Sequence, residues 1–276
     1  MHRVSRLLLV GVLLVGVAPL GAQEVTVARA TPLSDATIEN FLLKANVIKK
    51  KTSKKGVTGA IQATLSDGTL THDAQIQTVD LSKTVFEAGA HTELNFKDTY
   101  RFNIGAYRLA RLLDMDNVPM SVKRRYEGKD AAFTWWIDDV MFDEEGRMKQ
   151  QPVQGPDPNR TAKQNANRLV FDELIQNRDR NQGNLVWTKD WKLWLIDHTR
   201  AFRLGKDLMK PEQLGRIDGA LLARLRTLTI EAMTKSMGDV MQKDEMNAVL
   251  TRRDKLVKHF EDRIATRGEA AVLFKM

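Results

Sequence analysis

The sequence predicts an α+β fold with two lobes, a small lobe of strands around one helix and a larger lobe made mainly of helices. Alternating apolar residues separated by turn residues, a pattern typical of β-hairpins, dominate residues 56–137, whereas helical spacing dominates from residue 161 onward. The segment Gly146–Thr161 holds three of the seven prolines and few apolar side chains, a composition typical of the boundary between two lobes. We therefore expect a small lobe over residues 23–142 and a helical lobe over residues 143–276.

The first 22 residues have the three-part layout of a secretory signal peptide. Arg3 and Arg6 precede the apolar run Leu7–Val17, which is shorter than the roughly 20 residues of a membrane span. Small Ala22 stands where a signal peptidase would cleave, although Leu20 is a poor residue at position −3, so an N-terminal membrane anchor is the alternative. We expect cleavage after Ala22, a periplasmic or secreted protein, and no transmembrane span in the mature chain.

The elements of the small lobe follow from local patterns. Helical spacing predicts one amphipathic helix over Thr99–Leu113, which ends before Val118-Pro119. Pairs of apolar runs on either side of turn residues predict two hairpins. The other predicted elements are a short helix over Asp35–Lys44, strands over Gly56–Leu65 and Leu70–Val79, and strands over Ser121–Tyr126 and Ala131–Ile137.

The larger lobe begins with a helix and a tight hairpin. Apolar residues spaced four apart predict a helix that starts near Thr161 and ends near residue 176. Residues 185–196 then form a hairpin around a Lys189-Asp190 turn. Further helices are expected around residues 211–216, 219–228, 229–238 and 243–267.

The composition excludes several kinds of site. The 276 residues include no cysteine, which excludes disulfides, thiolate metal sites, iron–sulfur clusters, a cysteine nucleophile and a lipoprotein anchor. The histidines show no metal-ligand spacing, and the sequence lacks the Gly-x-Ser-x-Gly motif of α/β-hydrolases. The formal charge of +8 falls to about +6 without the signal peptide and is spread along the chain, so we expect no nucleic-acid partner.

A polar loop between the predicted helix and the hairpin carries the candidate chemistry. Residues Asn177–Asn184 are almost all polar, although apolar elements flank them on both sides. Asp179 and Asn184 are five residues apart, and Asp197 follows at the far end of the hairpin. Because a hairpin brings its two ends together, we expect oxygen atoms of all three residues to face one cleft. Alternatively, Asp179 caps the preceding helix, Asn184 fixes a turn and Asp197 pairs with Arg200.

Two segments resemble those of a known group of proteins. Phe171–Asn184 contains the run Asn-Arg-Asp-Arg-Asn-x-x-Asn, and Ile196–Phe202 reads Ile-Asp-His-Thr-Arg-Ala-Phe. Both resemble segments of atypical protein-kinase-like folds, in the HipA-type, phosphatidylinositol-kinase-like and secretory-pathway kinase groups. Gly105–Pro119 is similar to the small-lobe helix of these proteins. The resemblance covers residues from about 56 to 205.

The resemblance implies a phosphotransferase that uses ATP or another nucleotide together with Mg²⁺ or Mn²⁺. It implies that Asp179 is the catalytic residue that orients the acceptor hydroxyl, and that Asn184 and Asp197 bind the metal. The acceptor would be a protein, a sugar or a lipid headgroup. We expect the protein to be a monomer.

The small lobe departs from the pattern of the kinases. One kinase strand normally carries a lysine that contacts the nucleotide phosphates and pairs with a glutamate of the helix. The matching strand, His72–Asp80, contains no lysine, and Gln77 takes the best candidate position. Glu93 follows about where the helix glutamate should stand, and the alternative is a solvent-facing acid beside Lys97, four residues on in a helix.

A lysine cluster is the candidate source of the missing cation. Five lysines fall within Lys49–Lys55, and Lys54 and Lys55 are our candidates for contact with the nucleotide. Such a cluster is also typical of a solvated turn. Two functions therefore remain open: an exported, metal-dependent atypical kinase, or a catalytically inactive, kinase-like binding protein (a pseudokinase) that lacks the strand lysine.

Overall fold

The computed structural model describes residues 33–52, 60–88, 91–149 and 155–274. The chain divides into two units, Met1–Leu33 and Ser34–Met276, and every element below belongs to the second. The predicted signal peptide, residues 1–22, lies outside the described residues. No helix among the described residues is both long enough and apolar enough to cross a membrane.

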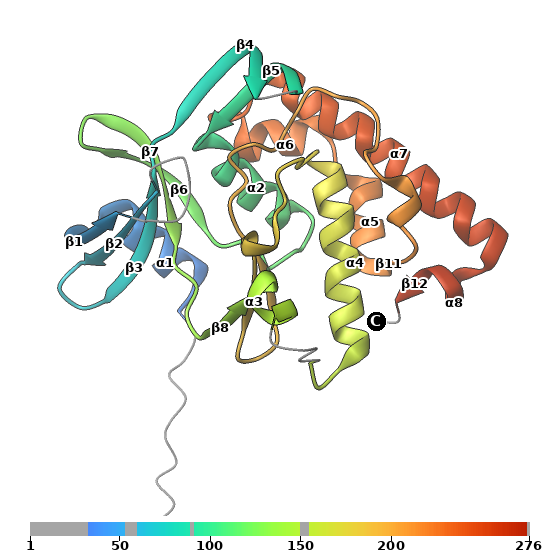
Figure 1. Ribbon diagram of the computed structural model, residues 1–276, viewed down its shortest axis with the longest axis horizontal. Helices are drawn as coiled ribbons and strands as arrows, with labels where there is room; N and C mark the ends of the chain where they lie inside the picture. The colour runs from blue at the N-terminus through green and yellow to red at the C-terminus, as the bar shows by residue number, and fades with distance from the viewer. Residues whose placement is uncertain (1–32, 53–59, 89–90, 150–154, 275–276) are drawn as a thin grey trace, which may run out of the picture. The chain divides into compact units, whose positions relative to one another are not determined.

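A five-stranded antiparallel sheet forms the first part of this unit (Figure 1). Its strand order is β1-β2-β3-β7-β6, and helix α1 packs on β6 and β7. Phe41 and Leu42 of α1 pack against Leu65, Ile76 and Phe133 of the sheet, and all five side chains are buried. The elements are α1 (Asp35–Lys44), β1 (Asn46–Thr52), β2 (Ile61–Ser66), β3 (Thr71–Gln77), β6 (Ser121–Tyr126) and β7 (Lys129–Trp135).

A separate hairpin and a buried helix stand between β3 and β6. Strands β4 (Asp80–Ala88) and β5 (His91–Thr99) pair only with each other among the described residues. Helix α2 (Arg101–Leu112) follows immediately and buries one face, including Phe102, Ile104 and Leu109. Its apolar residues belong to the large core of the helical part, while the helix also contacts β6 and β7.

The helical part also contains a small three-stranded sheet. Strand β8 (Val140–Asp143) pairs with β9 (Leu185–Thr188), and β9 pairs with β10 (Leu193–Leu195). Trp187 of β9 is buried, and its indole Nε1 donates a hydrogen bond to Glu144 Oε2 at 2.8 Å. The other elements are α3 (Glu144–Lys149), α4 (Pro158–Leu174), η1 (Gln182–Asn184), η2 (Pro211–Gln213), β11 (Ile217–Asp218), α5 (Gly219–Thr227), α6 (Ile230–Met237), α7 (Lys243–Arg267), α8 (Glu269–Val272) and β12 (Leu273–Phe274).

The structure confirms the α+β class with a sheet lobe and a helical part. The helix over Asp35–Lys44 and the strand over Ser121–Tyr126 are confirmed at the predicted bounds, and the hairpin over residues 185–196 is confirmed. The prediction missed β1, β8 and the β4–β5 hairpin. Lys49, Lys50 and Lys51 lie on strand β1 rather than in a turn, and Lys50 forms an exposed ion pair with Glu127 at 2.8 Å.

Candidate active site

The polar loop begins where α4 ends. The backbone N–H of Ile175 donates to the carbonyl of Phe171 and so closes the last turn of the helix. The next residue, Gln176, has a positive φ of 49°, and the chain turns there. The N–H of Phe202 donates to the carbonyl of Ile175 at 2.6 Å, so the segment after Asp197 lies against the end of α4. The loop and this segment therefore meet at one place.

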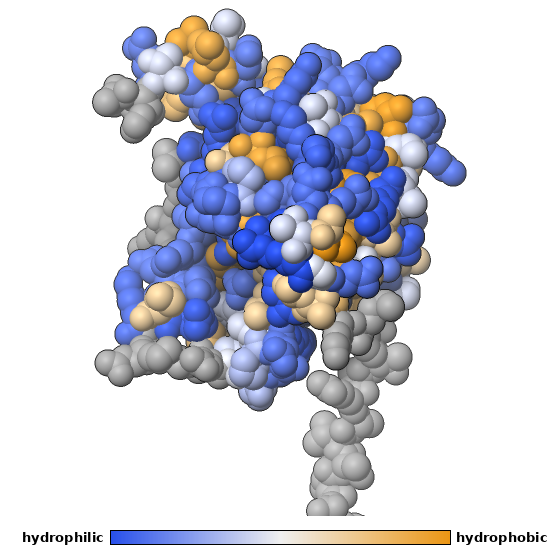
Figure 2. Space-filling model, turned by 90° about the vertical axis from the view of Figure 1, so that its right-hand side faces the viewer, coloured by the Kyte–Doolittle hydropathy of each residue, from blue (hydrophilic) through white to orange (hydrophobic). Residues whose placement is uncertain are grey.

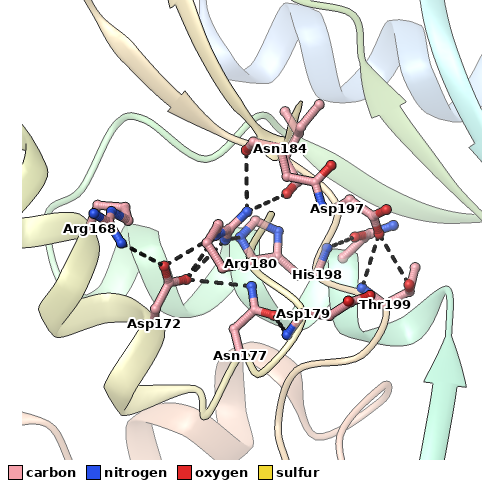
Figure 3. A network of polar contacts seen from close by, with 11 residues as sticks. Arg168, Asp172, Asn177, Asp179, Arg180, Asn184, Asp197, His198 and Thr199 are labelled. Atoms are coloured by element: carbon pink, nitrogen blue, oxygen red, sulfur yellow. Dashed lines mark hydrogen bonds and ion pairs between the residues drawn. The ribbon is translucent and has the colours of Figure 1, made fainter. Parts of the chain in front are cut away.

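Arg180 joins the parts of this site (Figure 3). Its side chain is 6% exposed, and its Nη2 forms an ion pair with Oδ1 of buried Asp172, on α4, at 3.0 Å. Its Nη1 donates to the carbonyls of Asn184 at 3.3 Å and Ile196 at 2.7 Å. One guanidinium group thus connects α4, the loop and the end of the hairpin, and a planar fork of donors suits such a junction.

His198 completes the contacts of Arg180. The His198 Nε2 atom lies 3.0 Å from Arg180 Nη2, and burial together with the charge of Arg180 lowers the pKa of His198 well below its usual value. The neutral ring accepts this hydrogen bond at Nε2, because the arginine can only donate. The backbone N–H of His198 donates to Asn103 Oδ1 of α2 at 2.8 Å, which connects the site to the small-lobe helix.

Figure 3 shows Asp179, Asn184 and Asp197 around the Arg180 network. Asp179 lies in a turn with its side chain 54% exposed, and its backbone N–H donates a hydrogen bond to Asn177 Oδ1 at 3.3 Å. Asn184 ends the short helix η1, and its carbonyl accepts from the N–H of Ile196 at 3.1 Å. The structure therefore brings the three predicted residues to one region, and their roles stay a prediction.

The carboxyl group of Asp197 is largely buried and lies near the charges of two other acidic residues. Burial raises the pKa of its carboxyl group, and the charges of Asp98 and Asp179 raise it further, although Thr199 opposes this by donating hydrogen bonds. Its backbone has a positive φ of 53°. A cation beside Asp197 would favour the charged form of its carboxyl group.

Arg200 and Asp98 also belong to the site, and Asp98 was not predicted from the sequence. Arg200 Nε donates to Asp98 Oδ2 at 3.0 Å, and its Nη1 lies 3.3 Å from Asp179 Oδ2. The suggested pair between Arg200 and Asp197 is replaced by these two contacts. Asp98 lies near the end of β5, about 80 residues before the loop in sequence, so no local pattern connects the two.

The predicted place of Glu93 is wrong. Glu93 lies on strand β5, opposite Phe86 of β4, and not on a helix. Its carboxylate pairs with Arg203 at 3.1 Å, and Lys97 pairs with Glu245 instead. Helix α2 itself contains no acidic residue, so the glutamate of the kinase pattern has no counterpart there.

Of the other residues predicted to contact the nucleotide, only Gln77 lies among the described residues. Gln77 is buried at the end of β3, opposite Ala132 of β7, and β3 contains no lysine. Lys54 and Lys55 lie outside the described residues.

The donor set fits a hard divalent cation. The amide oxygen of Asn184 and the carboxylate of Asp197 are the oxygen ligands that Mg²⁺ and Mn²⁺ prefer, and Mg²⁺ usually combines one or two carboxylates with phosphate oxygens and waters. No group of three or more His, Asp or Glu side chains that could hold a metal ion occurs in the described part of the chain. Asn184 and Asp197 therefore fit a metal that a nucleotide also binds.

Solved structures resemble this chain. The Golgi casein kinase with Mn/ADP bound has a TM-score of 0.64 and 13% identity, covering 87% of this chain and 79% of that chain. The hydra Fam20 structure with sugar has a TM-score of 0.67 and 14% identity, covering 88% and 94%. The Helicobacter pylori proinflammatory kinase CtkA has a TM-score of 0.53 and 11% identity, covering 85% and 99%. The chain has an atypical protein-kinase-like fold.

This kinase-like fold is shown by structure and not by sequence. No family model matches the chain, and no curated protein matches it. At 11–14% identity, the likeness extends to the fold and does not assign the chemistry. The predicted resemblance to atypical protein-kinase-like folds is confirmed for the fold, and the roles of the polar loop and of the Ile196–Phe202 segment stay a prediction.

Proposed function

We propose that the protein is a metal-dependent phosphotransferase of the kinase type. The observation that supports this most strongly is the Arg180 network, which fixes the loop carrying Asp179 and Asn184 to the strand end carrying Asp197. In the proposed reaction, the exposed Asp179 carboxylate accepts the hydrogen bond of the acceptor hydroxyl and orients it toward the terminal phosphate. Asn184 and Asp197 would hold Mg²⁺ or Mn²⁺, which would neutralise charge on the ATP phosphates.

The exposure of the Asp179 carboxylate supports this role. The carboxylate lies on a loop, is more than half exposed, and contacts Arg200 through one oxygen, Oδ2. Arg180 contacts the buried residues Asp172 and His198, and these contacts hold the loop in place on its buried side. An acceptor hydroxyl can therefore approach Asp179 from solvent, while the Arg180 contacts hold the proposed metal ligands Asn184 and Asp197 in place.

A direct test is phosphate transfer by the purified protein. The protein is incubated with radiolabelled ATP, Mg²⁺ or Mn²⁺, and protein, sugar or lipid-headgroup acceptors. We expect metal-dependent transfer, lost in Asp179→Ala and Asp197→Asn but retained in Asp254→Asn, whose carboxylate is 70% exposed on α7. Loss of transfer in all three variants, or transfer that survives Asp197→Asn, would contradict the proposed roles.

A kinase-like binding protein is the second candidate. The observation that favours it is the small lobe, where β3 carries no lysine and α2 carries no acidic residue. A melting-temperature titration with ATP and Mg²⁺ separates the two candidates. Metal-dependent stabilisation without any transfer indicates a nucleotide binder, and no stabilisation by any nucleotide indicates a different ligand.

We also propose that the protein is exported after removal of residues 1–22. The basic start, the short apolar run and the small residue Ala22 support this. Intact mass measurement of the protein from the periplasmic fraction is expected to show a chain that begins at Gln23. An uncleaved chain in the membrane fraction would indicate the N-terminal anchor.

A further inference from the structure

The β4–β5 hairpin is attached to the segment that follows Asp197. Glu93 of β5 pairs with Arg203 at 3.1 Å, and Asp98 of β5 pairs with Arg200 at 3.0 Å. Both guanidinium groups also lie over the ring of Phe96, at 5.5 Å for Arg200 and 5.0 Å for Arg203. The hairpin is not part of the five-stranded sheet, so these contacts are a specific connection between it and the candidate active site.

Arg200 contacts two carboxylates that differ in their surroundings. Asp98 is 2% exposed and stands at the end of a strand, whereas the side chain of Asp179 is 54% exposed on a loop. A buried side chain has little freedom, while an exposed loop carboxylate can occupy several rotamers. Arg200, whose guanidinium is rigid and planar, therefore fixes the mobile carboxylate relative to the buried one.

Only one oxygen of the buried Asp98 carboxylate is hydrogen-bonded among the described residues. Its Oδ1 is buried and has no hydrogen-bond partner among the described residues, while its Oδ2 accepts from Arg200. A buried carboxylate oxygen without a partner is unfavourable, and such groups in native proteins call for an explanation. A role in the active site supplies one.

We propose that Asp98 and Arg200 form a positioning relay that holds the Asp179 carboxylate in the orientation for the acceptor hydroxyl. The proposal rests on the proposed function of Asp179. Neither relay residue needs to touch the nucleotide, so the effect of the relay is read from the turnover number kcat. In this proposal the β4–β5 hairpin has a role at the active site, because β5 carries Asp98, the buried residue of the relay.

A double-mutant cycle on the full protein tests the relay. The variants are Asp98→Ala, Arg200→Met and the double variant, with Asp98→Asn as the conservative replacement and Glu87→Gln as the control. Glu87 is an exposed acid on β4 of the same hairpin. We expect each single variant to lower kcat by about 10- to 100-fold when it is measured at saturating ATP and metal, so that any change in their Kd does not enter the comparison. The double variant should lose no more than the worse single variant, and Asp98→Asn, which keeps an acceptor oxygen, should recover part of kcat.

Additive losses, or a kcat that Asp98→Ala leaves unchanged, would overturn the relay. If the wild-type protein transfers no phosphate, the proposed function fails, and amide hydrogen exchange of residues 177–184 then decides on the relay. Faster exchange there in Asp98→Ala but not in Glu87→Gln supports the contact chain, and equal exchange overturns it. If Asp98→Ala does not fold, Arg200→Met is measured against Glu87→Gln by the same two readouts.

Discussion

Arg180 contacts four groups from separate segments: the Asp172 carboxylate, the carbonyls of Asn184 and Ile196, and the ring of His198. Removing its side chain leaves Asp172 buried without its main partner, and breaking a buried ion pair costs about 3 to 5 kcal/mol. We expect Arg180→Ala to lower the free energy of unfolding by about 3 kcal/mol, as measured by urea denaturation.

The matched control for this change is two residues away. Arg178 is exposed and lies in the same loop. Arg178→Ala is expected to change the free energy of unfolding by about 0.5 kcal/mol or less. Equal effects of Arg178→Ala and Arg180→Ala would show that the loop is not organised through Arg180.

His198 gives the protein a pH dependence whose sign follows from its burial. Burial and Arg180 lower the pKa of this histidine well below its usual value, whereas in the unfolded chain the pKa is about 6.5. As the pH falls from 7 to 5, the unfolded state takes up a proton that the folded state refuses, so stability falls. We expect the decline to be smaller in His198→Gln, measured by urea denaturation at both pH values. An identical decline in the variant would contradict this.

The sequence allowed part of the site to be predicted. Asp179, Asn184 and Asp197 lie within 19 residues around one hairpin, so local spacing was enough to bring them together. Asp98 and Arg203 were not predicted, because their contacts join residues about 100 positions apart or bring a strand to a distant loop. Such pairings depend on tertiary structure and leave no periodic signal in sequence.

The segment after Asp197 is held by two buried charges. Glu173, near the end of α4, accepts hydrogen bonds from the N–H groups of Met209 at 2.5 Å and Lys210 at 2.8 Å. Arg252 of α7 donates to the carbonyls of Leu174, Arg203 and Gly205, and burial lowers its pKa to about 10. The arginine remains charged at neutral pH, and Glu173 stabilises that charge.

This arrangement predicts the effect of removing Glu173. Glu173→Ala leaves two backbone N–H groups without acceptors and Arg252 without a nearby negative charge. We expect a loss of about 2 to 3 kcal/mol in the free energy of unfolding and faster amide exchange over residues 203–210. Glu212→Ala, an exposed acid in η2, is the control. Unchanged exchange in Glu173→Ala would show that α7 and packing hold the segment without this carboxylate.

The β4–β5 hairpin shows why some elements escaped prediction. Glu93 and Lys97 are four apart, the spacing of a helical ion pair, yet both lie on β5 and have partners elsewhere. Asn95 interrupts the strand with a positive φ of 53°, and β4 is exposed along almost its whole length. Without a buried face, the alternation that marks a strand is weak.

The described residues of the unit Ser34–Met276 form two apolar clusters. One joins α1 to the five-stranded sheet, and the other joins α2 to the helices, while Tyr107 of α2 packs against both. Figure 2 shows a mostly hydrophilic face with scattered hydrophobic side chains. Because one helix contacts the sheet and also belongs to the helical core, we expect the two clusters to unfold together.

Two core truncations test this expectation. Ile76→Ala on β3 and Leu222→Ala on α5 each remove a buried side chain from a different cluster. Each is expected to cost about 2 to 5 kcal/mol and to shift one common transition, seen at the same urea concentration by fluorescence and circular dichroism. Two separate transitions, each moved by only one variant, would show that the clusters are independent.

Strand β8 connects the five-stranded sheet to the helical part, because it follows β7 in the chain and pairs with β9. The chain leaves β7 and, within a few residues, joins the ladder of β9, where Lys189 N–H also donates to the carbonyl of Asp139 at 2.9 Å. Strand β9 begins directly after Asn184 and leads through β10 to Asp197. Asn184 and Asp197 therefore flank the two ends of a hairpin whose first strand, β9, also pairs with β8. Bending between the five-stranded sheet and the helical part would change the positions of these two residues through β8.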